Sequence, residues 1–238
     1  MKDIEVSIVI PAYNEEKYLS LALQSLTDLQ TSKIFEVIVV DNDSSDNTAK
    51  LAKSFQDKLR LRVIPEQKKG RGAARARGFD EVKGGMIVSL DADSAVYPDW
   101  LDTLTDPLQD GAAATTTSCK IVDCSPLTNA VFNFIQPKAM VLYRLIVGHY
   151  WLSGFSFGIL KSVYEKSGGF DPALQAQEDL DLSFRVAKLG KIKFINKPVI
   201  FSGRRFKDGL WVGMYDYIRS FTQAFILKKK SVYLDNPR

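Results

Sequence analysis

The chain has 238 residues, of which 45% are hydrophobic and 25% are charged. These values are typical of soluble globular proteins and exclude a disordered or fibrous chain, and the length suits a single α/β domain with a sizeable core. Lys and Arg number 32 against 28 Asp and Glu, which gives a net charge of +4. This excess is too small to predict a nucleic-acid partner, although it suits a phosphate-bearing ligand or an anionic lipid surface.

Cysteine and histidine are scarce in this sequence. The chain contains Cys119, Cys124 and a single histidine, His149, which are too few for a disulfide framework or a zinc site of the Cys/His type. We therefore expect a protein of the reducing cytoplasm. The apolar region of residues 130–160 is interrupted by His149 and by the charged side chains of Lys138 and Arg144, so no membrane-spanning segment is predicted.

Strands and helices alternate in the first 95 residues. Short β-branched runs without polar alternation predict strands buried on both faces, and the longer stretches between them predict helices. The predicted strands cover residues 6–10, 36–40, 61–64 and 86–90, and the predicted helices cover residues 15–29, 46–55 and 72–82. This order indicates βαβ units with right-handed crossovers and a parallel sheet.

The pattern after residue 95 is more mixed. We expect a helix over residues 98–108, a strand over 112–120 and a long apolar, aromatic-rich helix from Pro126 to about Trp151. A strand, a short helix and a Gly168-Gly169 turn follow. The segment QAQEDLDLSFRVAKLG predicts a helix, because it has acids in its first turn and a glycine at its end. Two strands, residues 191–195 and 199–202, precede a final amphipathic helix with a basic end.

Four of the predicted strands end in polar segments. In a doubly wound parallel sheet, ligands collect beyond the carboxyl ends of the strands, so residues 11–15, 41–46, 65–70 and 91–93 are expected to outline one pocket. Some of these residues also have a simpler interpretation, because Asn14, Ser45 and Asp46 are good helix caps. Asp41 and Asn42 come before any cap is needed, which makes them candidates for hydrogen bonds to a nucleobase.

Basic residues cluster in the segment KKGRGAARARG. Its glycines at positions 70, 72 and 78 do not form a dinucleotide-binding G-x-G-x-x-G, since Arg75 occupies the place of the third glycine. Basic side chains at the start of a helix can instead bind a diphosphate. A solvated basic face is the alternative.

Two acidic clusters are candidates for chemistry. Asp91 and Asp93 follow a buried strand in VSLDADS, where two carboxylates can bind one divalent cation, and oxygen ligands favour Mg²⁺ or Mn²⁺. Such a cation would bridge a diphosphate. Glu178, Asp179 and Asp181 lie in the first turn of a predicted helix, where they either stabilise the helix dipole or supply a general base beside a substrate hydroxyl.

The order of these motifs resembles family 2 glycosyltransferases of the GT-A fold. The matching segments, in chain order, are SIVIPAYNEE, VIVVDNDSSDNT, KGRGAARARG, LDAD, GGFD and QEDLDLSFR. The resemblance implies one GT-A domain over residues 1–238, with a Rossmann-like, mostly parallel central sheet flanked by helices. It further implies a nucleotide-binding half (1–95), an acceptor and catalytic half (96–205) and a C-terminal, acceptor-side helical region (206–238).

The resemblance also implies roles for individual residues. The expected contacts to a nucleoside-diphosphate sugar are Pro11, Ala12, Tyr13, Glu15, Asp41, Asn42, Arg75 and Asp91. Asp93 and Asp91 are expected to bind the metal, Mn²⁺ or Mg²⁺, and Asp179 to act as the catalytic base, with Glu178 and Arg185 in support. The implied reaction is a single displacement that inverts the anomeric carbon, while the metal stabilises the departing diphosphate.

The sequence departs from the family pattern in three places. Many relatives have Asp at the position of Asn42 and Asn at the position of Ala76, and a downstream histidine often contacts the metal or the diphosphate. This chain has no histidine after His149, and the counterpart region reads FSGRRF. Our hypothesis is that Arg204 or Arg205 binds the diphosphate instead.

The sequence does not name the acceptor, but two of its segments bear on the kind of surface that the protein contacts. The segment of residues 129–154 and the final helix pair apolar faces with basic residues, which is typical of peripheral membrane contact and suits a glycan or lipid-linked acceptor. Core packing or a dimer interface explains the same residues. Two rival functions are those of a non-catalytic nucleotide-sugar or glycan-binding protein and of a nucleotidyltransferase. The intact Asp93 and Asp179 argue against the first, and the absence of a glycine-rich basic signature after the first strand argues against the second.

Overall fold

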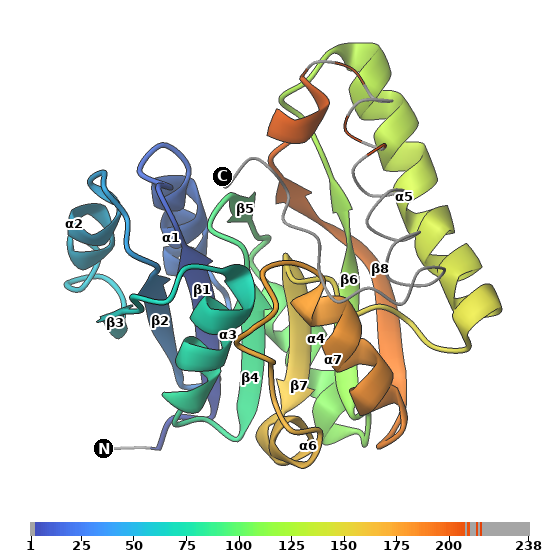
Figure 1. Cartoon of the computed structure of the whole chain (residues 1–238), viewed down its shortest axis with the longest axis horizontal. Helices are drawn as coiled ribbons and strands as arrows, with labels where there is room; N and C mark the ends of the chain where they lie inside the picture. Colours follow the sequence, from blue (N-terminus) through green and yellow to red (C-terminus); the bar gives the residue numbers. More distant parts are fainter. Residues whose placement is uncertain (1–2, 208, 210–212, 214, 216–238) are drawn as a thin grey trace.

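Within residues 3–207, 209, 213 and 215, which the computed structural model describes, the chain forms one mixed eight-stranded sheet with helices on both faces (Figure 1). Neighbouring strands follow the order β3-β2-β1-β4-β7-β6-β8-β5. The strands are β1 (Val6–Ala12), β2 (Phe35–Asp41), β3 (Leu61–Pro65), β4 (Met86–Leu90), β5 (Ser94–Ala95), β6 (Ala114–Lys120), β7 (Ser156–Leu160) and β8 (Ile192–Phe201). The helices are α1 (Leu19–Thr27), α2 (Thr48–Lys53), α3 (Arg71–Asp80), α4 (Trp100–Gln109), α5 (Pro126–Val147), α6 (Lys161–Lys166), α7 (Glu178–Ala187) and the 3₁₀ helix η1 (Arg204–Phe206).

The first half of the sheet is parallel, as predicted. β2 pairs with β1 and β3, and β4 pairs with the other side of β1, all in parallel register. The strand order therefore reverses between β1 and β4. Open α/β sheets bind ligands beyond the carboxyl ends of their strands at such a reversal, so the polar segments after β1, β2, β3 and β4 lie at the edge where a ligand is expected.

The second half of the sheet brings further segments to this edge. β7 runs antiparallel to β4 and β6, and β8 runs parallel to β6. The carboxyl end of β8 and the residues that precede β7 therefore lie at the same edge as the carboxyl ends of β1 and β4. The backbone N–H of Ser202, which follows β8, donates to the carbonyl oxygen of Asp93 at 3.1 Å, and this bond fixes the β8 end beside the β4 end.

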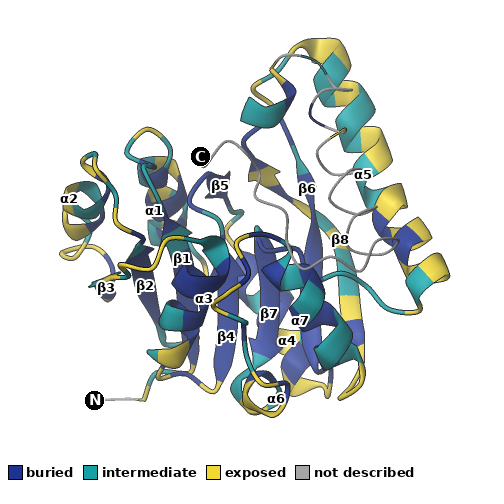
Figure 2. Ribbon diagram, viewed as in Figure 1, coloured by how far each residue is buried: buried dark blue, intermediate teal, exposed yellow. Residues whose placement is uncertain are grey.

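Two apolar clusters, one on each face of the sheet, hold the layers together. On one face α1 and α4 contribute Leu23 and Trp100, and on the other face α3 and α7 contribute Phe79 and Leu182. The central strands are buried on both sides (Figure 2). This explains why their sequences are continuous apolar runs rather than alternating ones.

One predicted boundary was wrong for a local reason. Residues 191–195 and 199–202, predicted as two strands, form the single strand β8. Its ladder with β6 is irregular between Thr117 and Cys119, where Ile195 and Val199 are the successive partners. Pro198 lies in this irregularity, so its missing N–H removes no ladder hydrogen bond.

The other predicted elements are present, with helices that are shorter than expected. α1 begins at Leu19 instead of residue 15 and α5 ends at Val147, while the Gly168-Gly169 turn has positive φ angles at both residues. The predicted C-terminal helix lies almost wholly outside the described residues, and the division into halves remains a prediction. Among the described residues, α5 is long and apolar enough to span a membrane by length and mean hydropathy, whereas its charged residues had led us to predict no membrane-spanning segment.

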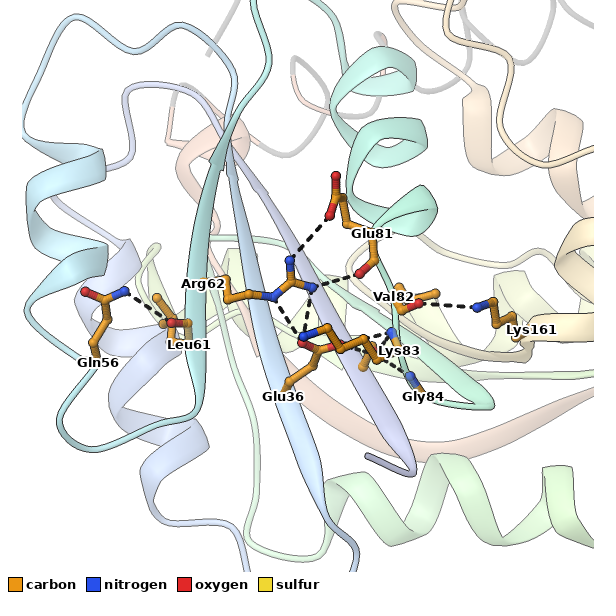
Figure 3. Close-up of polar contacts among 10 residues, drawn as sticks. Glu36, Gln56, Leu61, Arg62, Glu81, Val82, Lys83, Gly84 and Lys161 are labelled. Carbon is orange, nitrogen blue, oxygen red and sulfur yellow. Dashed lines mark hydrogen bonds and ion pairs between the residues drawn. The ribbon is translucent and has the colours of Figure 1, made fainter. Parts of the chain in front are cut away.

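A buried polar network lies around Glu36, at the start of β2 (Figure 3). The Glu36 carboxylate, 2% exposed, accepts hydrogen bonds from Ser7 Oγ at 2.8 Å, from the backbone N–H of Lys83 at 3.0 Å and from Arg62 Nε at 3.2 Å. Ser7 Oγ in turn accepts from the backbone N–H of Gly84 at 2.9 Å. The network ties the loop before β4 to β1, β2 and β3, and it is structural.

Replacement of Glu36 by Ala should destabilise the fold by about 2–3 kcal/mol, because three donors lose a buried acceptor. Urea unfolding at pH 7 measures this. Glu81→Ala is the matched control, since Glu81 contacts the same Arg62 guanidinium from a partly exposed position and should cost less than about 1 kcal/mol. Equal unfolding midpoints for the two variants would contradict the structural role of Glu36.

Candidate active site

The loops after β1 and β2 are hydrogen-bonded to each other. Asn14 Oδ1 accepts from the backbone N–H of Ser45 at 2.8 Å, and the backbone N–H of Glu15 donates to Thr48 Oγ1 at 2.8 Å. The helix-capping interpretation therefore fails for Asn14, which bridges two loops. Asp46 precedes Asn47, the N-cap of α2, and its Oδ1 accepts from the backbone N–H of Thr48, the first residue of the helix, at 2.9 Å.

Asn42 is engaged by the loop between β3 and α3. Its Nδ2 donates to the carbonyl oxygens of Glu66 and Lys68 at 3.0 and 2.8 Å, and its Oδ1 accepts from the backbone N–H of Gly70 at 2.9 Å. The amide that was predicted to read a nucleobase thus orders the loop in this structure. Asp41 differs, because its buried Oδ1 has no hydrogen-bond partner among the described residues.

The other predicted contacts of the first loop are the end of β1 and an aromatic ring. Pro11 and Ala12 lie in β1 opposite Val40 and Asp41. The ring of Tyr13 has the Lys69 ammonium 5.4 Å from its centroid. These residues surround the carboxyl ends of β1 and β2, beside the free Oδ1 of Asp41.

Arg75 joins the two acidic clusters. Its side chain is buried on α3; Nη2 donates to Asp91 Oδ1 at 2.7 Å, and Nη1 lies 3.5 Å from Glu178 Oε1. Burial lowers the pKa of the Arg75 guanidinium, but the carboxylates of Asp91, Glu178 and Asp179 outweigh burial and leave the pKa raised. The aspartates after β4 and the acids that open α7 therefore belong to one site.

Asp179 is held in a fixed orientation at the start of α7. Its Oδ2 accepts from the backbone N–H of Gly154 at 2.9 Å, and its Oδ1 accepts from the backbone N–H of Leu180 at 2.7 Å. Burial raises the pKa of Asp179 and of Glu178, and Arg75 opposes the rise at both. Each Asp179 oxygen keeps a lone pair for a further proton or hydrogen bond.

Gly154 is a site residue that the sequence analysis missed. A Cβ at this position would lie 2.2 Å from Arg75 Nη2 and 3.2 Å from Asp179 Oδ2. Only glycine leaves room for the guanidinium while its N–H reaches the aspartate. A Ser-Gly pair before a strand is too common a signal to have revealed this contact.

A second guanidinium, that of Arg204, links Glu15 to Asp93. Arg204 Nη1 donates to Glu15 Oε2 at 2.9 Å, and Nη2 lies 2.9 Å from Asp93 Oδ2. The Arg204 guanidinium also stands 4.8 Å from the ring centroid of Tyr18. Burial and the neighbouring charge of Asp91 raise the pKa of Asp93 to about 7, although the charge of Arg204 opposes the rise.

Arg205 and Arg185 differ in how they relate to this site. Burial raises the pKa of Asp93 and the charge of Arg205 opposes that rise, so Arg205 lies within electrostatic range of Asp93. Arg185 instead donates to Asp181 Oδ2 and to the carbonyl oxygen of Ser167, both at 2.6 Å. It fixes the Gly-Gly loop to α7, and these bonds give it a supporting role rather than a ligand contact.

The two acids after β4 can supply part of the ligand set of a hard cation. Within the described residues no three acidic, thiol or imidazole side chains form a ready metal cluster. Mg²⁺ and Mn²⁺ are commonly held by one or two carboxylates while substrate phosphates and water complete the shell. Asp91 and Asp93 supply that number of carboxylates, and the burial that raises the pKa of Asp93 disfavours a bare negative charge there, so these residues fit such an ion.

Comparison with solved structures identifies the fold. The chain aligns with residues 1–349 of S. aureus TarS in complex with UDP-GlcNAc at a TM-score of 0.68 and 20% identity, over 84% of this chain and 59% of that one. It aligns with the mannosyltransferase PcManGT from Pyrobaculum calidifontis in complex with GDP-Man and Mn²⁺ at a TM-score of 0.62 and 19% identity, over 92% and 65% of the two chains. The predicted GT-A glycosyltransferase fold is confirmed.

Sequence comparison gives the family. The chain is 28% identical to the probable glycosyltransferase YdaM of Bacillus subtilis over 99% of its own length, and it spans 61% of the length of that relative. The family model described as glycosyl transferase family 2 matches residues 7–168, more than half of the chain. The motif order that suggested this family is thereby confirmed, and the chain belongs to glycosyl transferase family 2.

Proposed function

We propose that this chain transfers a sugar from a nucleoside-diphosphate sugar to an acceptor hydroxyl with inversion at the anomeric carbon. The single observation that carries the proposal is Arg75, which contacts Asp91 on one side and Glu178 on the other. Through it, Asp91, which is suited to the donor side, and the acids that open α7, including the proposed base Asp179, stand in one site. A rival role as a binding protein or as a nucleotidyltransferase has no comparable support.

The donor is proposed to bind beyond β1, β2 and β4. The free Oδ1 of Asp41 and the Tyr13 ring are suited to base and ribose, and Asp91 and Asp93 to a divalent cation, Mn²⁺ or Mg²⁺. Such an ion would supply charge stabilisation for the departing diphosphate. The complexes of TarS with UDP-GlcNAc and of PcManGT with GDP-Man and Mn²⁺ support this class of donor and cation.

Asp179 is the proposed general base. The acceptor oxygen attacks the anomeric carbon as the bond to the diphosphate oxygen breaks, and the hydroxyl proton passes to an Asp179 oxygen. Burial raises the pKa of Asp179, which makes it a stronger base than an exposed aspartate, while the charge of Arg75 opposes the rise and favours the ionised form. Glu178 positions Arg75, and the Gly154 N–H orients the carboxylate, so no covalent intermediate is required.

Arg204 and Arg205 are the proposed substitutes for the family's downstream histidine. In this structure Arg204 neutralises Glu15 and Asp93. With every group ionised, the five acids Glu15, Asp91, Asp93, Glu178 and Asp179 exceed the three guanidinium groups of Arg75, Arg204 and Arg205 by two negative charges. This excess favours a divalent cation, and a diphosphate brought in with it would draw Arg204 from the carboxylates.

The acceptor and the location are also proposals. A glycan or lipid-linked acceptor, used at the cytoplasmic face of the membrane, is consistent with two unpaired cysteines and with the exposed apolar residues of α5.

Replacement of Asp179 by Asn should lower kcat about 10²- to 10⁴-fold, because the proton acceptor is lost, while donor affinity stays within about threefold of wild type. Steady-state kinetics and calorimetry measure the two quantities. Asp181→Asn is the matched control, since Asp181 lies on the same turn and pairs with Arg185. A kcat within threefold of wild type for Asp179→Asn would rule out the base.

Replacement of Arg204 or Arg205 by Ala should weaken donor binding about tenfold or more, as expected for loss of one charge-assisted phosphate contact. Calorimetric titration of the donor measures this, and Lys207→Ala, an exposed basic neighbour, is the control. Unchanged affinity in both arginine variants would remove the diphosphate role.

Thermal shift with UDP-, GDP- and dTDP-sugars, with and without Mn²⁺, should reveal the donor, because a ligand at 100 times its Kd stabilises the fold by about 2.7 kcal/mol. The Mn²⁺-dependent part of the shift should vanish in Asp93→Asn. An equal shift in that variant would show that the cation binds elsewhere.

A further inference from the structure

Helix α5 presents its polar side chains to the protein. The amide oxygens of Asn129, Asn133 and Gln136 accept hydrogen bonds from backbone N–H groups of residues 119–124, at 3.2, 2.9 and 3.2 Å. Asn133 and Asn129 also donate to carbonyl oxygens of the same segment. Helices at the surface of soluble proteins have the opposite arrangement, with apolar residues inward.

The outward face of α5 is apolar. Its large side chains, here called the α5 stripe, are Leu127, Phe134, Val141, Leu142, Leu145 and Ile146, and they are 43% to 75% exposed. They recur at helical spacings of three, four and seven residues and so share one side, opposite the buried Met140 and Tyr143. Figure 2 shows this side of α5 as largely exposed. A stripe of this size marks a contact surface.

The charge around the stripe has one sign. No acidic residue occurs between Asp123 and Glu165, while Lys138 and Arg144 are both on α5. At the carboxyl end of the helix, Arg144, Lys191 and Lys193 line a cavity of about 490 Å³, and none of the residues that line it is acidic. Its aromatic wall is formed by Tyr150 and Phe194, with ring centroids 5.2 Å apart.

An apolar helix with only basic charges fits an anionic lipid surface better than water, a neutral apolar partner or a second copy of itself. Insertion of the helix across the bilayer is disfavoured, because the inward amides bind the body of the protein along the first half of α5. We propose that the α5 stripe docks in the plane of an anionic membrane, with Arg144, Lys191 and Lys193 at the lipid headgroups.

The docked membrane would lie beside the acceptor side of the active site. The sulfur of Met140, on the inner side of α5, lies 3.9 Å from the hydroxyl oxygen of Ser153. Ser153 is the neighbour of Gly154. The charge of Asp179 also contributes to the raised pKa of Tyr143. The docking surface does not depend on the proposed transfer reaction, and vesicle binding is measured without donor or acceptor.

Cosedimentation of the full chain with vesicles tests the proposal. Wild type should bind vesicles of 30% phosphatidylglycerol in phosphatidylcholine, and Leu145→Glu with Ile146→Glu should reduce binding by at least about tenfold. Leu21→Glu is the matched control, because Leu21 is 59% exposed on α1, and it should bind as wild type does. Arg144→Gln with Lys191→Gln and Lys193→Gln should weaken binding to the anionic vesicles by roughly fivefold per cation.

Several results would overturn the proposal. The first is that wild type does not bind anionic vesicles, and the second is that the variant with Leu145→Glu and Ile146→Glu binds them as well as wild type does. Light scattering that shows a wild-type dimer, which becomes a monomer in that variant without vesicle binding, would assign the stripe to a second copy. A melting temperature lowered by the variant far more than by Leu21→Glu would assign it to contact within the chain, residues 216–238 included.

Discussion

The buried guanidinium of Arg75 is the interaction on which the site depends. A cation that is 2% exposed is stable only if nearby carboxylates offset its desolvation, and Glu178, which is itself buried, needs the cation for the same reason. The arrangement links α3, the end of β4 and the start of α7, three elements from different parts of the chain. Gly154 belongs to this interaction as well, since any larger residue would occupy the space of the guanidinium.

Arg204 likewise joins two carboxylates, at the other end of the site. It is bonded to Glu15 after β1 and to Asp93 after β4, so two guanidinium groups neutralise acids that come from both sides of the strand reversal. The two differ in environment, because Arg75 is enclosed while the side chain of Arg204 is 18% exposed. The more accessible group is the one suited to exchange its carboxylates for a phosphate. Under the proposed function, Arg75 would keep the acceptor side of the site fixed, and the ion pairs of Arg204 would be exchanged when the donor binds.

The same chain carries a surface that departs from ordinary soluble packing. The polar side chains of α5 form hydrogen bonds with the backbone that follows β6, where the strand pairing has ended. The large apolar side chains of α5 therefore lie on its outer face. A lipid surface would cover them and would place the membrane next to the loop that holds Asp179. Docking of the stripe as proposed would bring the acceptor side next to a hydrophobic phase, whichever sugar is transferred.

Short-range patterns in the sequence determined much of this protein. Continuous apolar runs predicted the four parallel strands, and Asp91, Asp93, Glu178 and Asp179 were recognisable because each pair lies within three positions at the end of a strand or the start of a helix. Only the tertiary structure decided the partners. Arg204 and Glu15 are 189 positions apart, Asn42 is hydrogen-bonded to the loop 28 positions away, and Gly154 matters only because two distant side chains converge on it. Local preferences are set by neighbours along the chain, whereas burial, and with it the choice of charge partner, is set by which segments the sheet brings together.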